Sequence, residues 1–342
     1  MRVALDAQLA VGTATGIGEY VVGLADALRA RGVDVVALAE PRLDPWRFDR
    51  RVLWDQGLLA WRAGRARADV LHCASGTVPL LTSLPVVATV HDVAWLRVQT
   101  HVRRYARYYF GKFSLARYRG VARIAVDSEF SRSELLAVLP EYDSHRVRVV
   151  YPGVASDFEL LARGEGDRRT ILVVGTVERR KNLGALIALL PQLAGARIVA
   201  VGPPTPYIAE CAELAASLGV GDRVEFRGYV DRRALLQLYA GCAVVAVPST
   251  YEGFGYAAAQ ALCAGTPCVV SDRGALPEIA ATDAPAIALE DRTAWLAALT
   301  SALDGNEDER AARCRESAIA RFAWSAGAQA MESVYRSAIF ES

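Results

Sequence analysis

Three consecutive cations, Arg179, Arg180 and Lys181, are the residues of this chain best placed to bind an anion. They follow an apolar strand pattern with a glycine turn, 170–175, and precede a helical pattern over 182–193. Free backbone N–H groups and the dipole at a helix start favour negative charge. The arrangement indicates a site that can stabilise a diphosphate without a metal. A solvated basic turn would have the same composition.

A carboxylate inside a glycine-rich turn is the second pattern with chemical potential, because Glu252 is followed by Gly253 and Gly255. The turn lies between an apolar strand and a helix predicted over 257–264. Glycine lets the backbone approach a ligand closely, so the carboxylate and nearby N–H groups can bind several sugar hydroxyls. A simpler interpretation is that Glu252 caps the helix, which explains the glycines less well. Gln260 lies about two helical turns further on.

Metal-ligand patterns do not occur in the sequence. There is no Asp-x-Asp pair, so the carboxylate clamp of metal-dependent transferases is missing. The six cysteines form no CxxC pair and no metal-type spacing with the four histidines. We therefore expect buried free thiols, no metal and no cofactor.

The charge is nearly balanced over the whole chain but not along it. The 342 residues carry 39 Lys+Arg and 38 Asp+Glu, a net charge of +1, and 53% of them are hydrophobic. These values exclude a disordered chain and argue against nucleic acid as a partner. Residues 1–155 hold 21 basic and 15 acidic side chains, whereas residues 156–342 hold 18 and 23. Halves of opposite sign suggest two domains.

A basic and aromatic segment, 97–123, contains eight cations and no acid. Such a segment can lie on anionic lipid headgroups, hold a phosphorylated acceptor, or pack against its own domain as an arginine-rich helix.

The N-terminal residues reach an acid at Asp6 before a signal-peptide core can form. No apolar run approaches the ~20 residues of a membrane span. We expect a cytoplasmic protein, with peripheral contact at the inner face of the membrane left open.

Short apolar strands alternate with helix-length segments along the chain, as in parallel α/β layers. The first series of predicted strands is 2–7, 34–38, 69–73, 86–92, 123–128 and 147–153. The second series is 170–175, 196–202, 223–230, 243–249, 267–272 and 284–289. Residues 156–169 have no apolar period and form the expected linker. Two doubly wound sheets are expected to bind ligands at the carboxyl ends of their strands, in the cleft between them.

Motifs along nearly the whole chain resemble those of the family-4 retaining glycosyltransferases, which have the GT-B fold. They are GIGEYVVGLADAL (16–28), VHDVAW (90–95), VDSEFSRSEL (126–135), VVYPGV (149–154), VGTVERRKNL (174–183), RGYV (227–230), EGFGYAAAQALCAGTPCVVSD (252–272) and LPEI (276–279). Each motif is weak alone, but their order is specific. The resemblance implies an α/β protein with two Rossmann-like, doubly wound parallel-sheet domains facing a cleft. Residues 1–155 and a returning helix at about 322–342 would bind the acceptor, and residues 168–320 the nucleotide sugar.

The resemblance also implies roles for individual residues. Arg180 and Lys181 would hold the donor's diphosphate, and Glu252 would accept a hydrogen bond from the donor sugar. His91 would orient the sugar and the acceptor. Further donor contacts would come from Gly16, Gly175, Thr176, Tyr229, Val230, Gly253, Phe254, Gly255 and Gln260. The acceptor side would include Asp92 and Ser128.

Two residues depart from the family pattern. Gln260 stands where a second glutamate usually binds the ribose hydroxyls, and losing a charge-assisted hydrogen bond would weaken donor binding. Thr176 stands where many members place an arginine, so Arg180 would share the diphosphate. The sub-pattern GT-x-E-x-RKN lacks that arginine too and resembles mannosyl- and rhamnosyl-type members. GDP-mannose is therefore the first expected donor, with UDP- and dTDP-sugars left open.

The function predicted from the sequence is transfer of a hexosyl group from a nucleotide diphosphate to an acceptor hydroxyl in glycan, glycolipid or metabolite biosynthesis. Configuration would be retained by front-face attack, as the resemblance implies, and no metal would be needed. Two alternatives stay open. Gln260 suits a degenerate GT-B protein that binds nucleotide without turnover. Two Rossmann-like sheets suit a nicotinamide-dependent dehydrogenase, although glycines 12, 16 and 18 do not form GxGxxG.

Overall fold

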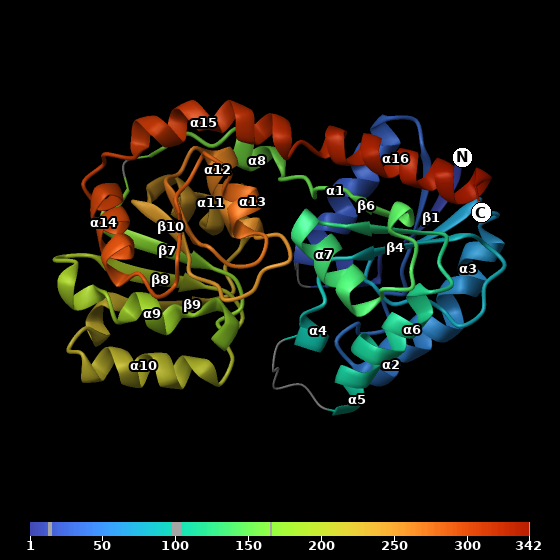
Figure 1. The fold of residues 1–342 in the computed structure, drawn as a ribbon, viewed down its shortest axis with the longest axis horizontal. Coiled ribbons are helices and arrows are strands. Elements are labelled where there is room, and N and C mark those ends of the chain that lie inside the picture. The colour runs from blue at the N-terminus through green and yellow to red at the C-terminus, as the bar shows by residue number, and fades with distance from the viewer. Residues whose placement is uncertain (13–15, 98–103, 165, 342) are drawn as a thin grey trace. The chain divides into compact units, whose positions relative to one another are not determined.

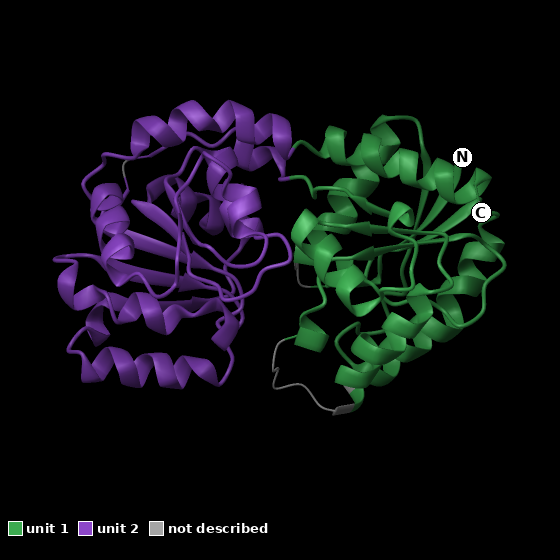
Figure 2. Ribbon diagram, in the orientation of Figure 1, with its two compact units in different colours: residues 1–153, 323–342 green, residues 154–322 purple. Residues whose placement is uncertain are grey.

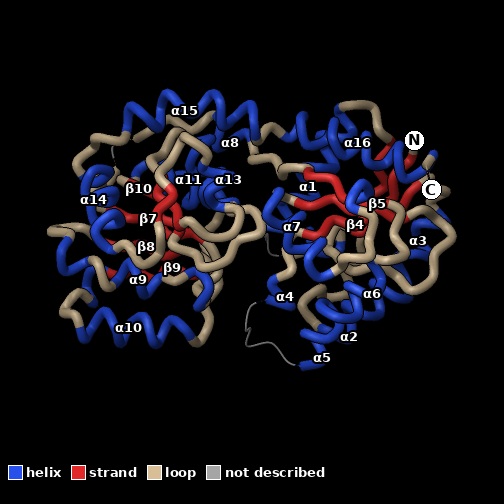
Figure 3. The backbone as a smooth tube through the Cα atoms, in the orientation of Figure 1, coloured by secondary structure: helices blue, strands red, loops and turns tan. Residues whose placement is uncertain are grey.

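The computed structural model describes residues 1–12, 16–97, 104–164 and 166–341, and within them two six-stranded parallel sheets form the centres of two units (Figures 1 and 3). Unit 1 comprises Met1–Gly153 and Ala323–Ser342, and unit 2 comprises Val154–Phe322 (Figure 2). The predicted fold class, with two Rossmann-like doubly wound sheets, is confirmed. The last helix of the chain belongs to unit 1.

The sheet of unit 1 has the strand order β2-β1-β3-β4-β5-β6. Its strands are β1 (Arg2–Asp6), β2 (Asp34–Leu38), β3 (Val70–Cys73), β4 (Val86–Val90), β5 (Arg123–Val126) and β6 (Val147–Val149). The helices around it are α1 (Gly16–Ala30), α2 (Phe48–Leu53), α3 (Leu59–Arg65), α4 (Ala94–Arg97), α5 (Arg104–Arg107), α6 (Ser114–Tyr118), α7 (Glu129–Val138) and α16 (Trp324–Phe340). The inner strands β1, β3, β4 and β5 are buried along almost their whole length, as expected of a parallel sheet covered by helices, whereas the edge strands β2 and β6 have exposed residues.

Alternation along each strand of unit 1 supplies two separate cores. Val3 and Leu5 of β1 pack with α1 and α16, whereas Ala4 points to the opposite cluster around Trp54. Trp324 at the start of α16 lies so close to Gly23 that a Cβ there would be 2.2 Å from the indole. The returning helix is therefore fitted against α1 without space for a side chain at that position.

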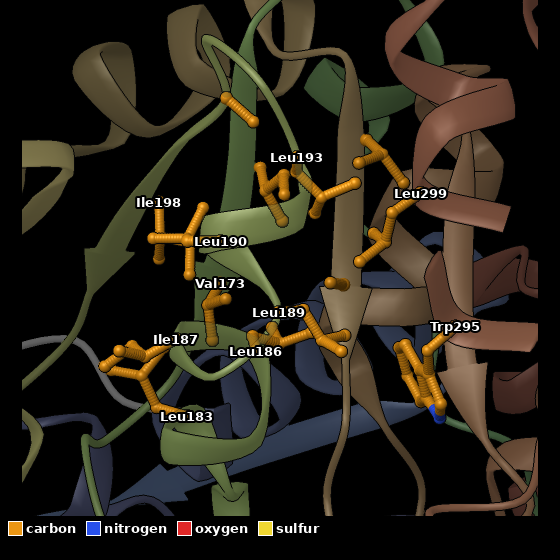
Figure 4. Close-up of a cluster of buried hydrophobic side chains, with 14 of the residues drawn as sticks. Val173, Leu183, Leu186, Ile187, Leu189, Leu190, Leu193, Ile198, Trp295 and Leu299 are labelled. Carbon is orange, nitrogen blue, oxygen red and sulfur yellow. The ribbon is translucent and has the colours of Figure 1, made fainter. Parts of the chain in front are cut away.

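The sheet of unit 2 has the order β12-β11-β10-β7-β8-β9. Its strands are β7 (Thr170–Val174), β8 (Arg197–Val201), β9 (Val224–Gly228), β10 (Val244–Val247), β11 (Cys268–Ser271) and β12 (Ala286–Ile287). Its helices are α8 (Ser156–Glu159), α9 (Leu183–Ile187), α10 (Tyr207–Ser217), α11 (Arg232–Gly241), α12 (Tyr256–Ala264), α13 (Leu276–Ala280), α14 (Arg292–Leu303) and α15 (Asp308–Arg321). Figure 4 shows part of the core of unit 2. Leucines on α9 and in the turn that follows it belong to the same buried cluster as Trp295 and Leu299 of α14.

Three segments differ from the sequence-based expectations. The helix predicted over 182–193 is only α9, followed by a 3-10 turn at Leu190–Gln192 that contains Pro191, because proline lacks the N–H that would continue the helix. The helical periodicity of the sequence that runs from Arg310 to about Ile339 is interrupted in the structure after Arg321, so that α15 and α16 are separate helices. The expected linker, 156–169, packs into unit 2, where Phe158 is fully buried.

Candidate functional site

A cluster of two cations and one carboxylate lies at the carboxyl ends of two neighbouring strands of unit 2. Arg180 and Lys181 occupy a 3-10 turn after β7, and Glu252 follows β10, which pairs directly with β7 (Figure 1). Arg180 Nη1 lies 3.1 Å from Glu252 Oε2, and the Lys181 ammonium contacts Glu252 Oε1. From β7 the sheet continues to β8 and β9 on one side and to β10, β11 and β12 on the other, so the strand order reverses between β7 and β10. Open α/β sheets bind ligands at such a switch point.

The carboxylate of Glu252 is almost completely buried but remains charged. Burial raises the pKa of Glu252, but Lys181 and Arg180 lower it more strongly, and the result is a pKa of about 2. Ser249 Oγ donates a further hydrogen bond of 2.7 Å to Oε1. The carboxylate is therefore an acceptor only, fixed at a buried position beside two cations.

Arg179, the third cation of the predicted anion site, is not part of the cluster. It is exposed and pairs with Glu210 on α10 at 2.6 Å. The basic turn therefore combines the two arrangements considered from the sequence, a candidate anion site and a solvated surface turn. Arg180 and Lys181 form the cluster, and Arg179 is a surface residue.

The backbone around the turn after Glu252 adopts conformations and close contacts that require glycine. Gly255 has φ +97° and is the N-cap of α12, and no side chain caps this helix, so Glu252 is not a helix cap. Gly274 has φ +64°, and a Cβ there would lie 2.6 Å from the carbonyl oxygen of Glu252. Phe254 is buried against Phe322, with ring centroids 5.7 Å apart.

The other predicted donor residues of unit 2 lie after β7, after β9 and on α12. Gly175 has φ +128°, and a Cβ there would be 3.3 Å from Lys181 Nζ; Thr176 follows it and is half-buried. Gln260 on α12 is buried, and its Oε1 accepts a hydrogen bond of 2.9 Å from the Tyr239 hydroxyl. Tyr229, which follows β9, is exposed, and Val230 is half-buried.

His91 lies in unit 1, at the carboxyl end of β4. Its Nδ1 is 2.7 Å from Asp127 Oδ2 and its Nε2 is 3.0 Å from the carbonyl oxygen of Ala74. Burial lowers the pKa of His91, but the Asp127 carboxylate raises it more, so the net pKa is raised. Because both partners are acceptors, a protonated ring donates to both. The side chain joins the loops after β3, β4 and β5, which is a fixed position compatible with orienting rather than nucleophilic chemistry.

The remaining predicted residues of unit 1 lie at or just before the starts of helices. Ser128 is the N-cap of α7, and its Oγ accepts a hydrogen bond of 2.9 Å from the N–H of Ser131. Asp92 Oδ1 accepts one of 2.9 Å from the N–H of Ala94. Gly16 is exposed and begins α1.

A buried charged network at the carboxyl ends of β1 and β3 escaped the sequence analysis. Asp6 Oδ2 accepts a hydrogen bond of 2.7 Å from Ser75 Oγ, and Arg51 Nε lies 2.9 Å from Asp55 Oδ2. Burial is the main reason that the pKa of Asp55 rises to about 6. The one available signal was the position of Asp6 at the end of a strand. Arg51 and Asp55 come from a helical region that has no motif.

The basic segment 97–123 is partly explained by contacts inside unit 1. Five of its cations bind carboxylates or carbonyl groups of that unit: Arg97, Arg107, Arg117, Arg119 and Arg123. Tyr109 and Tyr118 are buried, whereas Tyr105 and Tyr108 are exposed. Residues 98–103 lie outside the described residues. Contact with a membrane surface stays a prediction.

The described residues lack a metal-binding cluster and a membrane-spanning helix. They contain no group of three or more His, Cys, Asp or Glu side chains arranged to hold a metal ion. In the same part of the chain, no helix combines the length and the apolar character needed to cross a membrane. The six cysteines are free, and all but Cys314 are buried.

Two Rossmann-like units, one of them with a cationic cluster at its strand switch point, define a protein of the GT-B class. Family models agree. Residues 14–158 match "Glycosyltransferase Family 4", and residues 162–321 match "Glycosyl transferases group 1". Together, the two matches support a family 4-like glycosyltransferase. They do not favour a nicotinamide-dependent dehydrogenase or a degenerate nucleotide-binding protein.

Individual relatives are similar over much of the chain. A D-inositol 3-phosphate glycosyltransferase from Mycobacteroides abscessus is 28% identical over 82% of this chain and 71% of the relative. One from Xylanimonas cellulosilytica is 35% identical over 62% of this chain. The match spans 50–56% of the length of several such relatives. Among solved structures, HepE of Anabaena with UDP-glucose has a TM-score of 0.73 at 16% identity, covering 98% of this chain and all of that one. WaaG has a TM-score of 0.70 at 15% identity, covering 98% of this chain and 99% of that one.

Proposed function

We propose that this chain transfers a hexosyl group from a nucleoside diphosphate to an acceptor hydroxyl. The nucleotide sugar would bind in the domain of residues 168–320, and the acceptor in the domain of residues 1–155 with the returning helix at about 322–342. The observation that carries the proposal is the cluster in unit 2. Arg180 and Lys181 supply charge for a diphosphate, next to a Glu252 carboxylate that stays ionised and can accept a sugar hydroxyl.

The chemistry assigned to the cluster is electrostatic. As the glycosidic bond from the anomeric carbon to the phosphate oxygen breaks, negative charge develops on the diphosphate. Arg180 and Lys181 would stabilise that charge, since preorganised cations act on the transition state at no cost of reorganisation. The acceptor oxygen would form the new bond on the same face, and its proton would go to the departing phosphate oxygen. Configuration would thus be retained, and no metal would be required.

Donor and acceptor identity are the finer part of the proposal. The GT-x-E-x-RKN pattern supports GDP-mannose, with UDP- and dTDP-sugars as alternatives. The names of the relatives reported above support a small phosphorylated polyol, such as D-inositol 3-phosphate, among the acceptors to be tested. Gln260, which offers an amide where the family has a carboxylate, would contact the ribose.

A panel of nucleotide sugars in a thermal-shift assay tests donor binding, since a ligand that binds only the folded state raises the apparent stability by mass action. At a concentration near 100 times the dissociation constant the gain is ~2.7 kcal/mol. GDP-mannose should stabilise the chain more than GMP, which lacks the diphosphate. Stabilisation by none of the GDP-, UDP- and dTDP-sugars would contradict the proposal. Tight binding without sugar release, with or without acceptor, would favour the degenerate alternative.

A further inference from the structure

The carboxylate of Glu252 is paired with the same two cations that would bind a diphosphate. Its Oε1 accepts from both Lys181 Nζ and Ser249 Oγ, and its Oε2 accepts from Arg180 Nη1 at 3.1 Å. Arg180 Nε also lies 2.9 Å from Glu178 Oε1. When Glu178 is included with Glu252, two cations face two carboxylates, and these four side chains together have no net charge. A neutral group of side chains attracts an anion weakly unless one of its own ion pairs opens.

Of the two cations, Lys181 is the one that can change partner. Arg180 is held at several points, because its Nη1 also donates to the carbonyl oxygen of Tyr251 at 3.0 Å and its Nε pairs with Glu178. Glu252 is the partner of the Lys181 ammonium within the part of the chain that the structure describes. The lysine side chain lies along Gly175, where the missing Cβ leaves it space. Lysine is also a compact charge on a flexible stem, unlike the rigid fork of arginine.

Ser249 and the backbone hold the Glu252 carboxylate independently of Lys181. Ser249 is fully buried, and its own carbonyl oxygen accepts a hydrogen bond of 2.5 Å from Ser271 Oγ. The carbonyl oxygen of Glu252 accepts from the N–H of Ala275 at 2.9 Å. If Lys181 leaves, Oε1 keeps one donor and has a lone pair free for another.

We propose that Lys181 changes partner when the donor binds, moving from Glu252 Oε1 to the diphosphate, while Ser249 keeps the carboxylate in place to accept a sugar hydroxyl. This inference rests on the proposed function of the same cluster. It makes recognition of the diphosphate and of the sugar mutually dependent. After transfer, the nucleoside diphosphate has no sugar to occupy Glu252, so the carboxylate competes for Lys181 again and favours product release. Ser249 is then a positioning residue for this exchange.

Titration of the full-length protein with inorganic pyrophosphate, followed by calorimetry, tests the exchange. Glu252→Gln removes the competing charge, and pyrophosphate should then bind about tenfold more tightly, the order of one charge-assisted hydrogen bond. Glu210→Gln is the matched control, because Glu210 pairs with Arg179 on the same unit outside the cluster, and its affinity should equal that of the wild type. Lys181→Ala should bind pyrophosphate at least tenfold more weakly than the wild type.

The outcomes separate the inference from the proposed function. If Lys181→Ala weakens binding but Glu252→Gln binds as the wild type does, the exchange is wrong and the diphosphate site stands. If pyrophosphate binds neither the wild type nor any variant, or if Lys181→Ala has no effect, both are wrong. Tighter binding by Glu252→Gln together with loss in Lys181→Ala supports both.

The wild-type protein offers a second readout that needs no folded Glu252 variant. Lys112 and Lys181 are its two lysines, so isotope labelling of lysine gives two side-chain NMR signals. The signal that a Lys181→Arg variant lacks should shift when pyrophosphate is added, because its carboxylate neighbour is exchanged for phosphate. An unshifted signal at saturating pyrophosphate would overturn the exchange.

Ser249→Ala tests the positioning role because it should change kcat without weakening nucleotide binding. The nucleoside diphosphate should bind as tightly as to the wild type or more tightly, whereas kcat for sugar transfer should fall about tenfold, the order of one hydrogen bond to a charged group. Ser249→Thr keeps the hydroxyl and should restore kcat. Equal losses of nucleotide affinity and kcat in Ser249→Ala, with no rescue by threonine, would overturn the role of Ser249.

Discussion

Replacing Lys181 by methionine removes its charge while keeping an unbranched side chain, and the structure predicts a loss of stability that depends on pH. In the wild type the pKa of Glu252 falls from 4.5 to about 2, although burial alone would raise it. That difference corresponds to about 3 kcal/mol of folding free energy, at ~1.4 kcal/mol per unit of pKa. Lys181 is one of two cations responsible, so its removal should cost about 1–2 kcal/mol at neutral pH.

The sign of the pH effect follows from the lowered pKa. A carboxyl group with a folded-state pKa below its unfolded value stabilises the fold above pH 4.5, and this contribution is lost as the pH falls towards 2. The difference between the wild type and Lys181→Met should therefore be largest at neutral pH and shrink in acid. Thermal melts at several pH values measure it. For a unit of 154–322, a loss of about 1–2 kcal/mol lowers Tm by ~2–8 °C.

Arg179→Met is the control, because Arg179 is an exposed cation of the same turn that pairs with Glu210. Exposed pairs contribute about 0–1 kcal/mol, so its melting temperature should change by at most ~4 °C and show less dependence on pH. A destabilisation of Lys181→Met that is the same near pH 2 as at pH 7 would refute the electrostatic reasoning, because the wild-type carboxyl group becomes protonated only near its folded pKa of about 2. So would equal effects of the two substitutions.

Three further outcomes are expected. Tyr335→Phe removes the hydroxyl that lies 2.7 Å from His72 Nδ1, and both residues are fully buried. The free energy of unfolding, measured by denaturant titration, should therefore drop by ~1–3 kcal/mol. An unchanged value would show that this hydrogen bond is not formed. The raised pKa of His91 means that its pairing with Asp127 stabilises the fold fully below the unfolded value near 6.5 and loses that effect as the pH rises through the folded value. An NMR titration giving His91 a pKa below 6.5 would contradict this expectation. Gln260→Glu should bind nucleotide several-fold more tightly by restoring a charged acceptor, and unchanged affinity by calorimetry would show that this side chain does not face the ribose.

The parallel sheets could be predicted from the sequence because their inner strands are buried almost completely, and such strands are rich in β-branched and aliphatic residues. Each strand that the structure describes lies within a predicted strand segment, including the edge strands β2, β6, β9 and β12, which are partly exposed. The order of the strands could not be predicted in the same way. Neighbours such as β7 and β10 are far apart in the sequence, and their pairing depends on how the intervening helices pack.

The predicted site shows a similar division. The motif around Glu252 identified a carboxylate in a glycine turn. The residue types alone did not distinguish Arg180 from the adjacent cation Arg179, and only the family resemblance assigned the diphosphate to Arg180. Side-chain direction decides between them, and that depends on a 3-10 turn preceding Asn182 with φ +56°. The sequence also gave no sign of the hydrogen bond between Tyr335 and His72, because the two residues meet only once α16 is placed against the sheet of unit 1.

Release of nucleoside diphosphate from GDP-mannose, with UDP- and dTDP-sugars in parallel, is the most direct test that the Arg180–Lys181–Glu252 cluster is the catalytic donor site. With an acceptor such as D-inositol 3-phosphate present, the wild type and Arg179→Ala should turn over at similar rates. Lys181→Ala should lower kcat by ~100-fold or more, as expected when a preorganised charge stabiliser is lost. A Lys181→Ala rate equal to that of the wild type, with any donor that supports turnover, would contradict the account.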